Sequence, residues 1–118
     1  MPIRVGQMPY LNSAVFYHTL PKKSCHLVPL VPRLMAKALE ASHIVAGPLA
    51  IADVIRLGKL VKPLSDLCVA TKGKTVSILL FCRRDVSELS GASVGIINHT
   101  SSSVQLLRVL FAERWSVH

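Results

Sequence analysis

The sequence predicts an α/β fold, because strand-like segments alternate with helix-like segments along most of the chain. Of the 118 residues, 51% are hydrophobic and only 17% are charged, which is typical of an ordered globular chain. The stretch Val76–Cys82 is the most continuously apolar part of the sequence, as expected for a central strand that is covered on both faces. We therefore expect a largely parallel sheet with helices packed against it.

The first elements follow from alternation and from turn residues. Ile3–Gly6 alternates with polar neighbours and predicts a strand, which Pro9 helps to end because proline cannot donate to a sheet ladder. Asn12 and Ser13 are suitable N-cap residues for a short helix. A second strand is expected at His26–Leu30.

Proline and glycine mark the next elements. Pro32 suits the first turn of a helix whose apolar residues recur at helical spacing. Ile44–Ala46 predicts a short buried strand, and Pro48 opens a second helix that ends at Gly58. Beyond it, extended segments are expected at residues 60–64, 67–70, 76–82 and 93–97, and a last helix at residues 104–115.

The charge balance indicates an anionic ligand. Fourteen Lys and Arg residues against six Asp and Glu residues give a formal net charge of +8, which attracts anions of any kind. The basic residues are scattered among turns, and aromatic residues make up only 5% of the chain, too few for an obvious base-stacking surface. A small polyanionic substrate is therefore preferred to nucleic acid, and a spread of solvated surface charge is the simpler alternative.

Several other classes of protein lack support in the sequence. The three cysteines, Cys25, Cys68 and Cys82, do not have the spacing of a zinc or redox motif, so no metal is expected. No apolar run approaches the ~18 residues of a membrane helix. The first residues lack the apolar core of a secretory signal, so we expect a cytoplasmic location without membrane association. Dinucleotide, P-loop, zincin and serine-hydrolase motifs are all missing.

Three turns are candidate ligand sites, because ligands of open α/β sheets gather beyond the carboxyl ends of strands. Tyr10, Asn12 and Ser13 follow the first strand, although an ordinary helix cap is the simpler explanation of this spacing. Gly47 lies in the second turn, where a plain strand-to-helix connection is the alternative. The third turn offers hydroxyls and unpaired N–H groups at a helix start, which suit a carboxylate or phosphate; its residues are Thr100, Ser101, Ser102 and Ser103.

Five longer segments occur in a fixed order along nearly the whole chain: IRVGQMPYLNSAVFY, AGPLAIADVIRLG, PLSDLCVATKGKTVSILLFCRR, ELSGASVGI and TSSSVQLLRVLF. In this order the chain resembles the menaquinone-biosynthesis dehydratase family, and the YLNS motif and the apolar strand around Ser77 are the most specific parts. The resemblance implies a fold like that of type II periplasmic binding proteins. Residues 1–86 would form the first lobe, and residues 87–118 the crossing segment and first strand-helix unit of an incomplete second lobe.

The resemblance also implies a reaction. It is the dehydration of chorismate, a dicarboxylate, to 3-(1-carboxyvinyloxy)benzoate in the futalosine route to menaquinone, with no metal or organic cofactor. Asn12 and Ser77 match the residues that hold and polarise the substrate, whereas the turn of Thr100, Ser101 and Ser102 matches the one that receives a carboxylate. Neither Asn12 nor Ser77 is a strong base, so we infer that the enolpyruvyl carboxylate of the substrate takes the proton, with His99 as the alternative base.

Other interpretations remain open at this level. Family members are considerably longer, so we expect this sequence to be the front portion of such a protein. The apolar stripe of Leu107, Leu110 and Phe111 should then be exposed or only loosely packed. The same fold could also bind a small anion without catalysis. A basic nucleic-acid-binding protein would fit the charge but not the low aromatic content.

Overall fold

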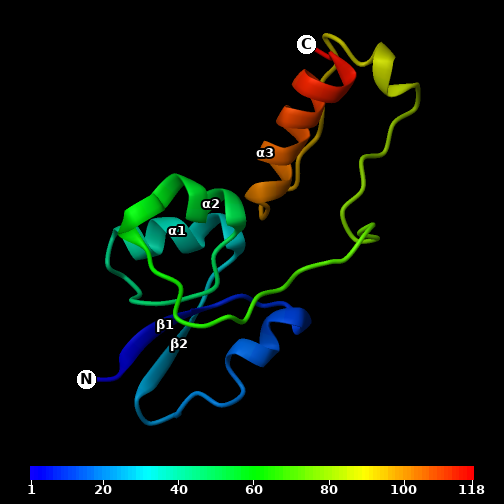
Figure 1. Cartoon of the computed structure of the whole chain (residues 1–118). Coiled ribbons are helices and arrows are strands. Elements are labelled where there is room, and N and C mark those ends of the chain that lie inside the picture. Colours follow the sequence, from blue (N-terminus) through cyan, green and yellow to red (C-terminus); the bar gives the residue numbers. More distant parts are fainter.

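A pair of parallel strands forms the centre of the computed structural model, which describes every residue of the chain (Figure 1). Strand β1 (Ile3–Gln7) pairs along its whole length with β2 (Cys25–Pro29). On the other side of β1, the Gly6 N–H donates to the Ala46 carbonyl at 2.8 Å, and a single parallel bridge joins Val5 to Ala46. The first three predicted extended segments therefore lie side by side in the expected parallel sense, although the third is an isolated bridge.

The turn after β1 differs from its prediction. It is a 3₁₀ helix, η1 (Leu11–Phe16), whose N-cap is Tyr10, and no side chain caps it. The capping role predicted for Asn12 and Ser13 was therefore wrong, because both residues lie inside the helix. A six-residue segment is shorter than two α-helical turns, so the i→i+3 bonds of a 3₁₀ helix suit it.

Tyr17 fastens η1 to the end of β1. Its hydroxyl oxygen accepts a hydrogen bond from the Met8 N–H at 2.9 Å, and burial raises the pKa of the phenol, which stays protonated at neutral pH. In Tyr17→Phe this N–H loses its acceptor, so we expect the free energy of unfolding to fall by about 1 kcal/mol. Urea denaturation measures the change, and Tyr10→Phe is the matched control because the Tyr10 hydroxyl makes no hydrogen bond. Equal stability of the two variants would contradict the assignment.

The two helices predicted next are both present. Helix α1 (Pro32–Glu40) begins with its proline in the first turn, as expected. Helix α2 (Ile51–Leu57) begins three residues after Pro48 rather than at it. Gly58 ends α2 with φ of +52°, a conformation that glycine adopts without steric cost.

The core lies between α1 and the strands. Met35 is fully buried at 0% exposure and packs with Ala38 and Ile44. A Cβ added to Gly47 would lie 2.9 Å from the Met35 sulfur, and one added to Gly6 would lie 2.8 Å from Ile44 Cδ1. The missing side chains at these two glycines therefore allow the Met35 side chain and α1 to approach the strands closely.

A long connection without strands, residues 61–101, follows the strands and helices α1 and α2. Residues 61–101 contain only one short 3₁₀ turn, Val86–Glu88, so the strands predicted at residues 76–82 and 93–97 are not formed. Val76 and Phe81 are each 87% exposed, the opposite of a central strand covered on both faces. The physical reason is that a strand needs a neighbour to pair its N–H and C=O groups, and no segment forms a ladder with this one.

The last predicted helix is present at the far end of this connection (Figure 1). It consists of α3 (Ser102–Val109) and a π-helical turn, η4 (Leu110–Trp115). The rings of Phe111 and Trp115 pack 5.8 Å apart, and Val117 is buried beneath them with its N–H donating to the Phe111 carbonyl. The stripe of Leu107, Leu110 and Phe111, predicted to be exposed or loosely packed, is half-buried, and α3 contacts α2.

The overall shape is elongated, with extents of 55 × 26 × 23 Å and a radius of gyration of 17.0 Å. A compact domain of this length would have a radius of about 13.5 Å. The accessible surface of 9633 Å² likewise exceeds the roughly 6,300 Å² of a folded monomer of this mass. The excess follows from the connection, whose apolar side chains stay outside the core. None of the helices combines the length and the apolar character needed to cross a membrane.

Candidate functional site

The candidate ligand residues after β1 lie in η1 or at its N-cap. Ser13 is buried at 3% exposure, and its hydroxyl donates to Asn12 Oδ1 at 3.4 Å. Asn12 and Tyr10 are exposed, and the amide nitrogen of Asn12 makes no hydrogen bond. This end of the sheet therefore presents a free amide donor to a ligand.

Gly47 and Ser77 have different surroundings from those of η1. Gly47 packs against the Met35 side chain. Close packing in an ordinary strand-to-helix connection therefore explains why a glycine lies at this position. Ser77 lies on the exposed connection, where its N–H donates to Thr75 Oγ1 at 3.4 Å. Asn12 and Ser77 share no hydrogen bond, and their joint role stays a prediction.

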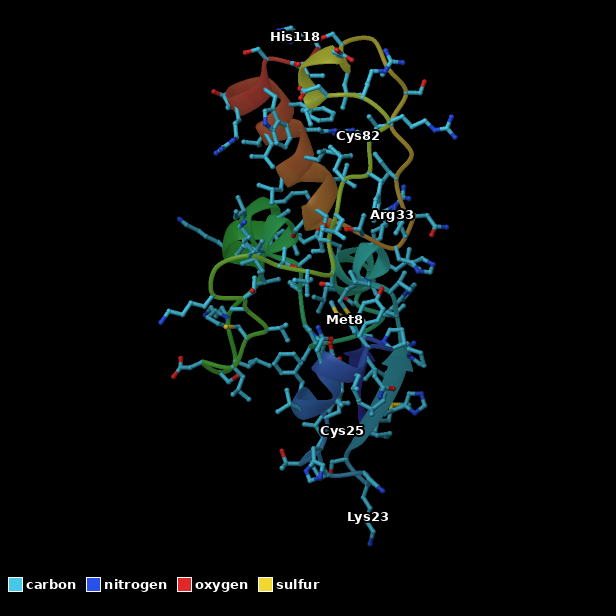
Figure 2. The ribbon with its side chains drawn as sticks, turned by 90° about the vertical axis from the view of Figure 1, so that its right-hand side faces the viewer. Met8, Lys23, Cys25, Arg33, Cys82 and His118 are labelled. Carbon is cyan, nitrogen blue, oxygen red and sulfur yellow. The ribbon has the colours of Figure 1, made fainter.

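The Thr100–Ser102 turn lies at a cavity of about 510 Å³ between α1, α2 and α3. Thr100 and Ser101 line it, together with residues 96–98 of the connection. The Arg33 N–H in the first turn of α1 donates to the His99 carbonyl at 3.3 Å, which holds the turn against this helix. Figure 2 shows Arg33 at the junction between the strand-containing body and the C-terminal helix. The structure thus brings one predicted turn to a cavity, and does not bring Asn12 or Ser77 to the same one.

A charged network forms one wall of this cavity. Arg56 on α2 binds Glu40 of α1 with two hydrogen bonds, Nη1–Oε1 at 2.9 Å and Nη2–Oε2 at 3.4 Å. Its Nε lies 3.6 Å from Asp53 Oδ1. The other oxygen of Asp53 accepts a hydrogen bond from the Ser101 hydroxyl at 2.7 Å. The network therefore links α1 and α2 to the head of α3.

The hydroxyl of Ser102 supports the same junction. It accepts a hydrogen bond at 2.9 Å from the N–H of Ala52, in the first turn of α2. No side chain from its own segment caps α2, so this serine satisfies an N–H group that the helix leaves free. Ser101 and Ser102 are thus both engaged within the protein, and a bound carboxylate would have to compete with Asp53 for the Ser101 hydroxyl.

The sequence interpretation missed this network. Asp53 and Arg56 are three residues apart on one helix, a spacing from which their pairing could have been predicted. The pairing of Arg56 with Glu40 depends on how α1 and α2 pack, which no local pattern shows. No three His, Cys, Asp or Glu side chains lie together in a way that could hold a metal ion, and all three cysteines are free.

The Arg56–Glu40 pair predicts a pH dependence of stability. The hydrogen bond from Arg56 lowers the pKa of Glu40 below its usual 4.5. Because the folded-state pKa is the lower one, the pair stabilises the folded chain fully above the unfolded-state value, and the effect is lost as the pH falls through the folded-state value. Between about pH 6 and about pH 3, the urea midpoint of the native chain should fall further than that of Glu40→Gln. The difference is expected to be small because the pair is exposed, and equal pH dependence would contradict it.

Comparison with known protein families finds one family model that matches the chain. The family model described as "Menaquinone biosynthesis" matches residues 3–118, which is nearly the whole chain. The match includes η1, the connection with Ser77 and the Thr100–Ser102 turn. No solved structure matches the chain.

Proposed function

The chain belongs to the menaquinone biosynthesis family, and from this premise we propose that it is a hydro-lyase that dehydrates chorismate to 3-(1-carboxyvinyloxy)benzoate. The observation that carries the proposal is the family match over residues 3–118, which includes the YLNS motif and the TSSS turn in one chain. A role in menaquinone biosynthesis follows from the family itself, whereas the reaction and the substrate are the proposed part.

The proposed reaction does not require a strong acid or a strong base from the protein. A C–H bond and the C–O bond to the ring hydroxyl break, one water leaves, and the ring becomes aromatic, which supplies the driving force. The enzyme then has to fix geometry and stabilise the departing hydroxyl. The free amide donor of Asn12 and the exposed hydroxyl of Ser77 suit these two tasks, and the substrate's own enolpyruvyl carboxylate would accept the proton.

The proposal includes an arrangement of the chain. Residues 1–86 would belong to the first lobe of a fold like that of type II periplasmic binding proteins, and residues 87–118 to the second. The parallel pairing of β1 and β2, each followed by a helix, supports a first lobe of this type. The enzyme would work in the cytoplasm without a cofactor, with a small dicarboxylate as its ligand.

Incubation of the protein with chorismate tests the proposal. We expect loss of one water to be visible as a mass change and as the absorbance of a new aromatic product. Unchanged chorismate in the presence of measurable binding would reject catalysis. It would select the second candidate, an anion-binding module of the same fold, which the cationic side chains around the α1–α2–α3 cavity favour.

A further inference from the structure

The C-terminal unit, residues 86–118, is attached to the strand-containing body, residues 1–60, without a shared hydrophobic core. No residue from 61 to 116 is buried, and every buried side chain other than Val117 belongs to the body. Where the two parts meet, α1, α2 and α3 surround an open cavity of about 510 Å³ instead of packing closely. Burial of apolar surface therefore contributes little to holding the unit in place.

The C-terminal unit is stabilised by contacts of its own. The Gly91 N–H donates to the His118 carbonyl at 2.8 Å, and the Val117 N–H donates to the Phe111 carbonyl at 2.9 Å. The connection that leads to the unit forms side-chain hydrogen bonds only within itself, and Figure 1 shows α3 beyond α1 and α2 at the end of this connection. The unit can therefore keep its own structure when its contacts with the body are broken.

Three hydrogen bonds join the unit to the body, and all three come from the turn at residues 99–102. They are the backbone N–H of Arg33 to the His99 carbonyl at 3.3 Å, the Ala52 N–H to Ser102 Oγ at 2.9 Å, and the Ser101 hydroxyl to Asp53 Oδ2 at 2.7 Å. No ion pair crosses between the two parts. The bond to Asp53 is the shortest and is the only one that ends on a charged group, so we expect it to be the strongest.

Asp53 is itself held in place for this contact. Its side chain is only 13% exposed, and its other oxygen lies 3.6 Å from Arg56 Nε. Arg56 in turn binds Glu40 of α1 with two hydrogen bonds. The Asp53 carboxylate would therefore have to leave Arg56 in order to turn away from Ser101.

We propose that Asp53 and the turn at residues 99–102 form a polar latch, which holds the C-terminal unit on the body and opens as a whole. Because the three bonds start from four consecutive residues, loss of the bond between Asp53 and Ser101 frees the turn to move and loosens the other two. In the latched state Ser101 donates its hydrogen to the chain's own carboxylate, so this hydroxyl donor is withheld from any other acceptor. Control of the substrate carboxylate by the latch rests on the proposed function, whereas the latch itself does not.

Amide hydrogen exchange, measured by NMR without substrate, tests the latch. In Ser101→Ala we expect the amides of Ala52 and Arg33 to exchange about 5-fold faster or more, although neither of them bonds to Ser101. The amide of Leu30 donates to the Gln7 carbonyl within the body and should change less than about 2-fold. Unchanged exchange at Ala52 and Arg33 would overturn the proposal. An equal acceleration at Leu30 would also overturn it, since the variant would then act through global unfolding.

Matched variants separate the latch from a general effect of substitution. Ser103→Ala makes the same change at a neighbouring serine that forms no side-chain hydrogen bond, and it should alter the exchange of Ala52 less than about 2-fold. Asp53→Ala should reproduce the acceleration, and Asp53→Ala/Ser101→Ala should be no faster than Asp53→Ala alone, because both changes remove the same bond. Additive acceleration would show that the two residues act separately and would reject the latch. Chorismate turnover is measured separately, so failure of the latch and failure of the proposed reaction give different results.

Discussion

Replacement of Met35 by alanine is expected to lower the free energy of unfolding by about 2–5 kcal/mol, which is a large part of the stability of a small domain. Met35 is fully buried and packs against Ile44, Gly6 of β1 and Gly47 of the following turn. Only nine of the 118 residues are buried, so few other contacts can compensate for the cavity that alanine would leave. The sulfur and methyl groups would also no longer fill the space that Gly6 and Gly47 leave open.

Urea denaturation followed by circular dichroism measures this effect. Leu34→Ala is the matched control, because it removes a side chain of similar size from the same helix at a position that is 47% exposed. We expect the control to cost below about 1 kcal/mol. If the two variants were equally stable, the packing of α1 against the strands would not be the main source of stability.

The parts of the fold that sequence reasoning predicted well are those that local patterns determine. Proline at the start of α1 and glycine at the end of α2 act through backbone geometry within a few residues, so their consequences can be read directly. The alternation at β1 likewise predicted a strand, although Val5 is buried and Ile3 is 51% exposed. The same local logic predicted a helix at residues 104–115. The observed helix runs from Ser102 to Trp115, although little of it is buried.

The failures concern features that require a distant partner. The apolar run Val76–Cys82 predicts a central strand only if neighbouring strands are available, and no strand of the structure pairs with it. Its exposed side chains show that hydrophobic composition alone does not produce a sheet, because the backbone groups also need a pairing edge.

The candidate site shows the same limit. The Thr100–Ser102 turn was correctly placed at the head of a helix, as its hydroxyl residues suggested. Its actual partners, Asp53 and Ala52, are about fifty residues away in the chain and come close only because α2 contacts α3. A sequence pattern can therefore identify a polar turn, but not which hydroxyls are already occupied.

The largest expected effect on activity is at the residues proposed to act on the substrate. If chorismate is dehydrated as proposed, Asn12→Ala or Ser77→Ala should lower kcat by about 100-fold or more, the usual cost of losing one hydrogen-bond donor to a developing charge. The fold should be retained, since Asn12 bonds only to its neighbour Ser13 and Ser77 is exposed. Ser93→Ala is the control, because this serine is exposed and forms no side-chain hydrogen bond.

The variant Asn12→Asp tests whether the Asn12 side chain lies close enough to the substrate for an added negative charge to affect binding. It keeps the size of the side chain, but it replaces the free amide donor with a carboxylate that repels a doubly negative substrate. We expect this variant to raise KM for chorismate as well as to lower kcat, whereas Asn12→Ala should act mainly on kcat. Native kinetics in Asn12→Ala and Ser77→Ala would remove both residues from the mechanism. A change confined to Asn12→Asp would leave Asn12 near the substrate but without a part in the reaction.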